Sequence, residues 1–324
     1  MKRPKKIFIV GFGSISRKYI RFIKLYYPEV QIYILCSEKK KIYKEANLVD
    51  CFYSNFSYSK NLNPDGVIIA SPATKHLSDA LNFIDLGIPI LIEKPLSNNL
   101  KNVSNFQKIV KEKKSKVLVG YLIRHSEIAN LFKNNLGSNK LGSFLFSKIN
   151  CSSYLPDWRP SQDYRRTVSS SSLYGGGVLL ELSHEIDYAN WFFGPFLKVQ
   201  AVLKNTGTLD IDVEDIADLV LTNNNGINVQ IHLDFCSRFR ERNCTVYGSE
   251  ATMKWDYLNK KLEIIGPNSN SLFFRQGNNL DQMFKNQLDY FLNSAFNGKD
   301  FENNLDESIQ TLKIIESAKL SNQL

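Results

Sequence analysis

The chain has 324 residues, of which 43% are hydrophobic and 23% are charged, and its formal net charge is +9 at pH 7. This length is enough for two domains with separate cores, and the composition is that of an ordinary soluble globular protein. No apolar run approaches the roughly 20 residues that span a bilayer, and the basic start at residues 1–6 precedes an apolar stretch too short for a signal peptide. We therefore expect a cytoplasmic protein that does not associate with membranes.

The positive charge raises the question of nucleic acid binding. The lysines, however, lie in separate short clusters at residues 39–41 and 111–116, and no nucleic-acid motif accompanies them. We expect no nucleic-acid partner and infer a general preference for anionic small molecules. The five cysteines and four histidines lack the spacing of a metal site, so the sequence predicts reduced cysteines and no bound metal.

The first 121 residues alternate between short apolar strands and helices. Strands are expected at residues 7–10, 32–35, 66–70, 90–92 and 116–120, and helices at about residues 14–27, 75–86 and 100–113. Such alternation predicts an α/β Rossmann domain, a doubly wound parallel sheet, over residues 1–121.

The pattern changes after residue 121 to longer strands of alternating polarity. Strands are expected at residues 144–151, 199–204, 216–222, 227–235 and 243–247, and helices at about 127–135, from 178, at 280–297 and at 305–320. The Asn-Asn-Asn-Gly tip at residues 223–226 is a strong hairpin signal. We predict an α+β domain over residues 122–324 with a mostly antiparallel open sheet, whose C-terminal helices could pack back on the first domain.

The glycine turn at Gly11 and Gly13 lies between an expected strand and an expected helix, the context that a dinucleotide-binding fingerprint requires. Gly11 permits a tight turn and Gly13 lets the backbone approach a pyrophosphate, while the helix start at Ser14 and Ile15 supplies N–H donors. Ser16 stands at the third glycine position. A simple strand-to-helix turn is the alternative, and the surrounding strand–helix–strand pattern favours nucleotide binding.

The end of the second strand bears on the choice of cofactor. NAD sites usually carry a carboxylate there for the ribose hydroxyls, whereas this chain has Ser37 followed by Lys39. A small hydroxyl beside cations suits a ribose 2′-phosphate, so NADP is favoured. Glu38 could still reach the ribose, which keeps NAD open.

Glu93, Lys94 and Pro95 directly follow the apolar strand at residues 90–92. They therefore lie at the carboxyl edge of the predicted sheet, where open α/β folds bind their ligands. Taken alone, Lys94 is better explained as a solvated lysine paired with Glu93. The other motifs reverse that preference.

His184 provides a candidate acid/base group in the second half of the chain. Glu181, His184 and Asp187 are spaced by three residues, which predicts one shared helical face. Imidazole can take the proton of a reacting hydroxyl, a lysine ammonium can polarise the oxygen, and a carboxylate can orient the imidazole. The alternative is a core histidine on an otherwise apolar helix.

Taken in order, these motifs resemble the Gfo/Idh/MocA family, that is, glucose-fructose oxidoreductase and inositol-dehydrogenase-like enzymes. The resemblance covers essentially the whole chain. The segments that carry it are the Gly11 turn, residues 70–76 (Ala-Ser-Pro-Ala-Thr-Lys-His), Glu93-Lys94-Pro95, residues 175–187 and residues 247–250.

The resemblance implies a Rossmann domain, a second domain whose open sheet often forms an oligomer interface, and oxidation or reduction of a sugar-like alcohol. It implies that Lys94 lies near the reacting hydroxyl and that His184 acts as acid/base. Many family members have an aspartate four residues before the histidine, where this chain has Leu180. Which of Glu181 and Asp187 assists His184 therefore stays open. On the cofactor side, the resemblance implies contacts to the dinucleotide from Ser71, Pro72, His76, Glu93 and Lys94.

The polar-aromatic loop at residues 154–166 is the candidate substrate loop. Trp158 and Tyr164 could stack on a sugar ring, while Arg159 and Arg165 could grip a carboxylate or phosphate. An ordered loop pinned by Trp158 on the core is an equal alternative. Tyr121 and Arg124, just after the last strand of the first domain, are also expected to face the cleft.

We therefore expect an NAD(P)-dependent dehydrogenase or reductase acting on a secondary alcohol or ketone of a sugar or nucleotide-sugar. It should form a homodimer or homotetramer through the C-terminal sheet. An NAD-dependent glycosidase with a recycling cofactor and a non-catalytic regulator that senses dinucleotide are the alternatives.

Overall fold

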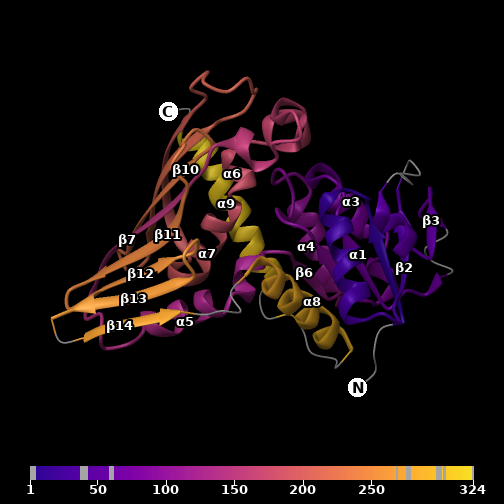
Figure 1. Ribbon diagram of the computed structural model, residues 1–324, viewed down its shortest axis with the longest axis horizontal. Coiled ribbons are helices and arrows are strands. Elements are labelled where there is room, and N and C mark those ends of the chain that lie inside the picture. Colours follow the sequence, from indigo (N-terminus) through magenta and orange to yellow (C-terminus); the bar gives the residue numbers. More distant parts are fainter. Residues whose placement is uncertain are drawn as a thin grey trace. The chain divides into compact units, whose positions relative to one another are not determined.

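The computed structural model describes residues 5–36, 43–57, 62–267, 269–274, 279–296, 301 and 304–322. Contacts between Cα atoms divide the chain into two compact units (Figure 1). Unit 1 comprises residues 1–121 and 284–309, and unit 2 comprises residues 122–283 and 310–324. Each unit has its own sheet. No helix in the described ranges combines the length and the apolar composition that crossing a membrane requires.

Unit 1 is built on a six-stranded sheet in the order β3-β2-β1-β4-β5-β6, with every neighbouring pair parallel. The strands are β1 (Lys6–Val10), β2 (Gln31–Leu35), β3 (Cys51–Tyr53), β4 (Gly66–Ile69), β5 (Ile90–Ile92) and β6 (Val117–Val119). The strands β4, β5 and β6 are buried along their whole length, as continuous apolar strands covered on both faces should be. This order confirms the predicted doubly wound Rossmann sheet. The edge strand β3 was not predicted, since three half-buried residues give little periodic signal.

The helices of unit 1 include segments far apart in sequence. They are α1 (Ser14–Tyr26), α3 (His76–Leu81), α4 (Val103–Glu112), most of α8 (Leu280–Phe296) and the first residues of α9 (Asn304–Ser321). Phe284 of α8 packs against Tyr19 and Phe22 of α1, with ring centroids 5.6 and 5.8 Å apart. The C-terminal part of the chain thus supplies part of the core of unit 1.

The single helix expected at residues 75–86 is wrong, because the segment forms three short pieces. They are the 3₁₀ turn Ala73–Lys75, α3, and the 3₁₀ turn Ile84–Leu86. The side chain of Asn82 donates to the backbone oxygen of Ser78 at 2.9 Å, at the point where α3 ends. Such local side-chain hydrogen bonds compete with helix propagation.

Unit 2 is built on an eight-stranded sheet in the order β14-β13-β12-β11-β7-β10-β9-β8. All neighbouring pairs are antiparallel except β7 and β10, which confirms the mostly antiparallel sheet. The strands are β7 (Phe144–Ser152), β8 (Phe196–Lys204), β9 (Ile216–Asn223), β10 (Asn228–Asp234), β11 (Glu241–Gly248), β12 (Thr252–Asp256), β13 (Lys261–Gly266) and β14 (Ser269–Phe274). The β9–β10 hairpin turns at Asn223–Gly226, where the Gly226 amide donates to the Asn223 carbonyl at 3.1 Å.

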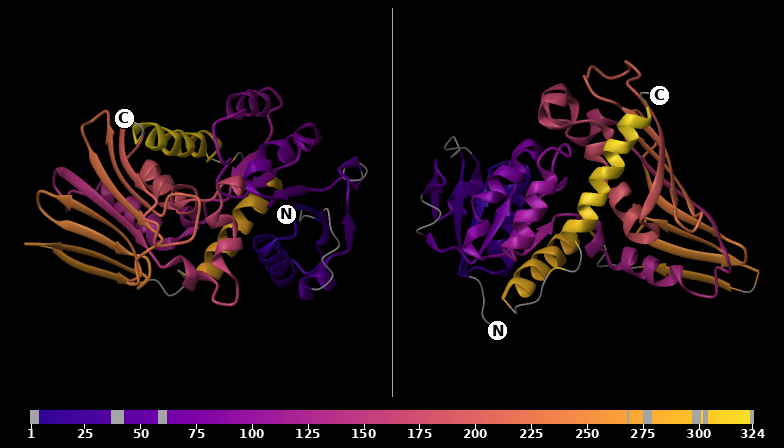
Figure 2. Two further views of the ribbon diagram at one scale, coloured as in Figure 1. Left: turned by 90° about the horizontal axis from the view of Figure 1, so that it is seen from above. Right: turned by 180° about the vertical axis from the view of Figure 1, so that it is seen from behind.

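Strands β12, β13 and β14 were not predicted individually, although β12 alternates between buried and less buried residues as a half-buried strand should. Helices α5 (Glu127–Leu136), α6 (Val178–Glu181) and α7 (Ser183–Phe193) lie on one face of this sheet (Figure 2). Trp255 of β12 lies at the centre of this core, with its ring 5.4 Å from that of Tyr188 and 6.2 Å from that of Phe132. The other face carries the exposed members of the alternating pattern.

Candidate functional site

The glycine turn after β1 packs tightly on the neighbouring strand. Gly11 has a φ of +99°, and a Cβ atom there would lie 2.7 Å from the Ala70 carbonyl oxygen at the end of β4. Only glycine fits both this backbone conformation and this close approach. Gly13 differs, because a Cβ atom there would have no heavy atom within 4 Å from any described residue other than its two chain neighbours.

Helix α1 begins directly after this turn with its N–H groups uncapped. Gly13 is the N-cap residue, and no side chain in the described part of the chain caps the helix. The amides of Ser14 and Ile15 therefore remain available for an anionic ligand, and the helix dipole favours negative charge there. Open space at Gly13 and free amide donors fit the pyrophosphate of a dinucleotide. Ser37 and Lys39, the residues expected beside the ribose, lie outside the described residues.

His76 connects the turns that follow β4 and β5. Its ring is buried, with Nδ1 2.8 Å from the Pro95 carbonyl oxygen and Nε2 2.8 Å from the Ser71 carbonyl oxygen. Burial lowers the pKa of His76. The Ser71 hydroxyl donates to Asp79 at 2.6 Å. These contacts hold the Ser71–Pro72 turn and the Lys94–Pro95 turn at a fixed separation, and Lys94–Pro95 itself is a cis peptide.

The carboxylate of Glu93 turns inward and is held by neutral donors. The Tyr19 hydroxyl donates to Glu93 Oε1 at 2.5 Å, and Gln287 Nε2 of α8 approaches the Tyr19 oxygen at 2.6 Å. A Cβ atom at Gly120 would lie 3.2 Å from the same carboxylate oxygen, so the glycine leaves room for the acid. Burial raises the pKa of Glu93, while Tyr19 and Lys94 act in the opposite direction. Neither Tyr19 nor Gln287 lies in a motif or periodic pattern from which these contacts could be predicted.

In unit 2, the segment that carries His184 is interrupted. Helix α6 ends at Glu181 and α7 begins at Ser183, so the residue between them, Leu182, breaks the helix. The prediction that Glu181, His184 and Asp187 share one helical face is therefore wrong for Glu181. Its carboxylate instead accepts a hydrogen bond from Ser169 at 3.0 Å.

Asp187 and Arg124 form a buried bidentate pair. Arg124 Nε and Nη2 each donate to an Asp187 carboxylate oxygen at 2.8 Å, and the Thr311 hydroxyl donates to the same group at 3.3 Å. Their side chains are 9% and 1% exposed, respectively. Arg124, expected to face a substrate, thus holds one of the two acids expected to assist His184.

A second arginine–carboxylate pair flanks the same helix. Glu185 has no exposed surface, and Arg242 of β11 donates to its two oxygens at 2.7 and 3.2 Å. The Arg242 guanidinium also lies 4.8 Å from the centre of the Tyr257 ring. Although burial alone would lower the pKa of Arg242, Glu185 raises it overall. Charge pairs thus fix α7 at the residue after His184 and at Asp187.

The candidate substrate residues of the loop at residues 154–166 fall into two groups. Trp158, Arg159 and Tyr164 line one small hollow, and the Trp158 ring meets Phe235 edge-on at 5.3 Å while its Nε1 donates to Ser153. Arg165 instead donates to both oxygens of Asp163, at 2.8 and 2.9 Å.

Tyr121 is 1% exposed, so its side chain offers almost no surface to a ligand.

Two family models match the chain. The model described as "Oxidoreductase family, NAD-binding Rossmann fold" matches residues 5–121. The model described as "GFO/IDH/MocA C-terminal domain" matches residues 132–254. Together they cover most of both sheets.

Curated relatives and solved structures agree with these matches. An uncharacterized oxidoreductase of Synechocystis sp. is 25% identical over 240 residues, which are 69% of this chain and 64% of that protein. The chain therefore aligns with less than two thirds of this relative's length. Levoglucosan dehydrogenase in complex with NADH and levoglucosan has a TM-score of 0.83 at 17% identity, over 98% of this chain and 97% of that one. The WlbA dehydrogenase of Bordetella pertussis in complex with NADH and UDP-GlcNAcA has a TM-score of 0.80 at 18% identity, over 99% and 97%.

Proposed function

Because the chain belongs to the Gfo/Idh/MocA family of oxidoreductases, we propose that it transfers a hydride between the nicotinamide of NAD(P) and a secondary alcohol or ketone of a sugar or nucleotide-sugar. One observation of unit 1 carries the proposal. The uncapped start of α1 follows β1, and Lys94 follows β5, so both lie at the carboxyl edge of one parallel sheet. The complexes of similar fold with NADH and a sugar ligand support the same chemistry.

The residues of unit 1 bind and orient. Gly11, Gly13, Ser14 and Ile15 hold the pyrophosphate, and the Ser71–Pro72 turn lies at the same sheet edge. Bound there, the dinucleotide supplies the hydride acceptor or donor. The Lys94 ammonium polarises the reacting oxygen and holds it in position. Ser37 and Lys39 favour NADP over NAD.

The residues of unit 2 move the proton. His184 takes the hydroxyl proton during oxidation and returns it during reduction, since imidazole titrates in the required range. Asp187, held by Arg124, and Glu181, held by Ser169, position the segment on both sides of His184. The hollow lined by Trp158, Arg159 and Tyr164 receives part of the substrate.

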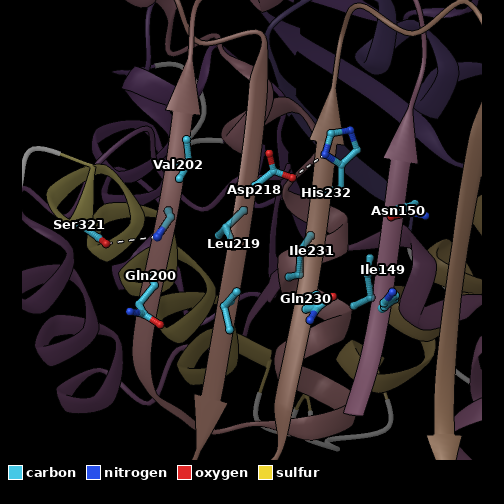
Figure 3. A pocket seen from close by; sticks show the side chains of 13 residues that line it. Ile149, Asn150, Gln200, Val202, Asp218, Leu219, Gln230, Ile231, His232 and Ser321 are labelled. Carbon is cyan, nitrogen blue, oxygen red and sulfur yellow. Dashed lines mark hydrogen bonds and ion pairs between the residues drawn. The ribbon is translucent and has the colours of Figure 1, made fainter.

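We further propose that a second copy of the chain covers the outer face of the unit 2 sheet, giving a homodimer or homotetramer. Side chains of β7, β8, β9 and β10 line a hollow on this face (Figure 3). Val202, Asp218, His232 and Asn150 form one cross-strand row there. Val202, Ile265 and Leu272 are more than half exposed on this face, which favours burial against a partner. Sedimentation velocity, which reports the mass of the assembly, tests this proposal.

The Lys94→Ala variant tests the reaction. With the preferred cofactor identified by titration, a panel of sugars and nucleotide-sugars is assayed at the nicotinamide absorbance. We expect the variant to lose about 10²- to 10³-fold in kcat while cofactor binding persists, because a donor aimed at the reacting oxygen is removed. Lys101→Ala, which removes an exposed lysine of the same unit, is the matched control.

Two results would contradict this function. Full activity of Lys94→Ala with cofactor bound would remove the lysine from the mechanism. Product release with no net change in NAD(P)H would instead indicate glycoside cleavage with a recycling cofactor.

A further inference from the structure

Two loops of unit 2 lie side by side where the parallel strands β7 and β10 end. The Ser153 amide donates to the Asp234 carbonyl at 3.2 Å, and the Leu155 amide donates to the Phe235 carbonyl at 2.9 Å. The loop after β7 contains Arg159, and the loop after β10 contains Arg238 and Arg240. The fold thus brings basic residues from distant segments to one sheet edge.

The shorter loop is fixed by the side chain of Asp234. Its carboxylate accepts from the Cys236 amide at 2.8 Å, the Ser237 amide at 2.6 Å and the Ser237 hydroxyl at 2.9 Å. Arg238, Phe239 and Arg240 follow directly on this turn. A pinned loop presents its side chains at a lower entropic cost than a mobile one.

The arginines on this edge lack an acidic partner in the part of the chain that the structure describes. Among the described residues, no carboxylate oxygen lies within 4.0 Å of the guanidinium of Arg159, Arg238 or Arg240. Asp163, by contrast, already pairs with both Arg165 and Arg166. Unpaired guanidinium groups with a planar fork of donors suit phosphate and carboxylate ligands.

Aromatic rings accompany these charges. The Arg238 guanidinium lies 3.4 Å from the centre of the Tyr154 ring, which orients it. Phe239, between the two arginines, is 76% exposed, the largest exposed fraction among the large apolar side chains described. An exposed ring beside cations can stack on a flat base while the cations bind phosphate.

Side chains at this sheet edge contact residues that hold the segment containing His184. Trp158 and Arg159 share their hollow with Ser169, and Ser169 donates to Glu181, three residues before His184. On the other side, Arg240 lies close enough to Cys151 to oppose, together with Arg242, the rise that burial causes in the pKa of that thiol. Arg242 in turn pairs with Glu185.

We propose that Arg159, Arg238 and Arg240, with Phe239, form an anion-binding subsite for the phosphate-bearing end of the substrate, which is a nucleotide-linked sugar. The inference rests on the proposed function for the reaction at the sugar, but the subsite can be tested by binding alone. Three guanidinium groups exceed what the single carboxylate of a uronic acid needs, and they match a diphosphate. The exposed Phe239 ring adds a surface for the base.

Binding is measured by calorimetry on the full chain with the preferred cofactor, NADP or NAD, saturating, so that the cofactor site is filled. The probes are uridine diphosphate, inorganic pyrophosphate, glucuronate and glucose. We expect uridine diphosphate to bind most tightly and to weaken at least tenfold in Arg240→Gln. Arg166→Gln removes the same charge from an 88% exposed arginine nearby and should leave the affinity within twofold. Phe239→Ala should weaken uridine diphosphate several-fold and leave pyrophosphate unchanged.

The outcomes separate the subsite from the reaction. If Arg240→Gln and Arg166→Gln lost the same affinity for uridine diphosphate, the loss would reflect the protein's overall charge, and the proposed subsite would be wrong. If glucuronate bound more tightly than uridine diphosphate and pyrophosphate, the preferred anion would be a carboxylate, and the proposal of a nucleotide-linked substrate would be wrong. Lys94→Ala should bind uridine diphosphate as wild type does, so its activity tests the reaction independently. Thermal unfolding of each variant checks that it is folded.

Discussion

Glu93 in unit 1 and Glu185 in unit 2 each lie next to a proposed catalytic residue, yet their carboxylates meet different partners. Glu93 accepts from a tyrosine hydroxyl that an amide supports, whereas Glu185 is paired with an arginine at both oxygens. Asp187 is likewise paired with an arginine, Arg124, at both carboxylate oxygens. In unit 1, a neutral tyrosine hydroxyl thus holds Glu93, with no arginine bonded to it. In unit 2, two arginine–carboxylate ion pairs hold helix α7.

In the proposed mechanism, the difference follows from what each carboxylate has to position. Lys94 is itself a cation, and a further cation bonded to Glu93 would compete with it for the same carboxylate and would repel it. In that mechanism His184 changes charge when it takes a proton, and the ion pairs at Glu185 and Asp187 keep its helix in place in either state. Each arrangement can be tested by removing one partner.

The largest effect is expected for Arg242→Met. The substitution leaves the Glu185 carboxylate buried without a partner, which costs about 3–5 kcal/mol of unfolding free energy. Urea unfolding measures the loss. The double variant Glu185→Gln/Arg242→Met removes both charges and should recover most of it. A loss of less than about 1 kcal/mol in the single variant would show that this pair does not brace α7.

A smaller effect is expected for Tyr19→Phe, which deletes the neutral donor to Glu93. Hydrogen bonds to charged groups contribute about 1.5–3 kcal/mol, and the loss should appear as lower stability together with lower kcat. Tyr33→Phe is the matched control, because that hydroxyl bonds an exposed Gln31 side chain. If both variants unfold at the same urea concentration, the Tyr19 hydroxyl does not hold Glu93 in place.

The smallest effect is expected at His232, a half-buried counterpart of the buried pairs. Asp234 and Asp218 raise the pKa of His232 to about 9, above its ordinary value of 6.5. A raised pKa in the folded state contributes stability that is complete below pH 6.5 and is lost as the pH rises through 9. The stability advantage of wild type over His232→Gln should therefore fall between these pH values. A histidine titration midpoint near 6.5 by NMR would contradict the assignment.

The fold was accessible from the sequence because its signals are local. The apolar run Ile90–Ile92 followed by Glu93 and Lys94 marks the end of a central strand, and the structure has β5 there. The turn at Asn223–Gly226 likewise carries its own hairpin signal. Short strands without a strong pattern, such as β3, were missed for the same reason.

Partners across long separations could not be predicted. Tyr19 meets Gln287 at a separation of 268 residues, and Glu185 meets Arg242 at 57. Neither contact has a periodic or motif signal, because each depends on which elements the tertiary fold places together. The helix break at Leu182 could not be predicted either, because the sequence pattern does not distinguish an apolar residue between two helices from one within a helix.

The contribution of α8 to unit 1 has a consequence for the order in which the protein can fold during synthesis. All six strands of the unit 1 sheet lie within the first 121 residues and are synthesised first. Phe284 and Gln287, which pack on α1, are synthesised only after residues 122–283. At a translation rate of about 5–20 residues per second, this interval lasts on the order of 10–30 s. During it, the apolar surface around Phe22 is not yet covered by α8, and the Tyr19 hydroxyl does not yet accept from the Gln287 amide. A chaperone that binds nascent chains would find its target on α1 during that interval.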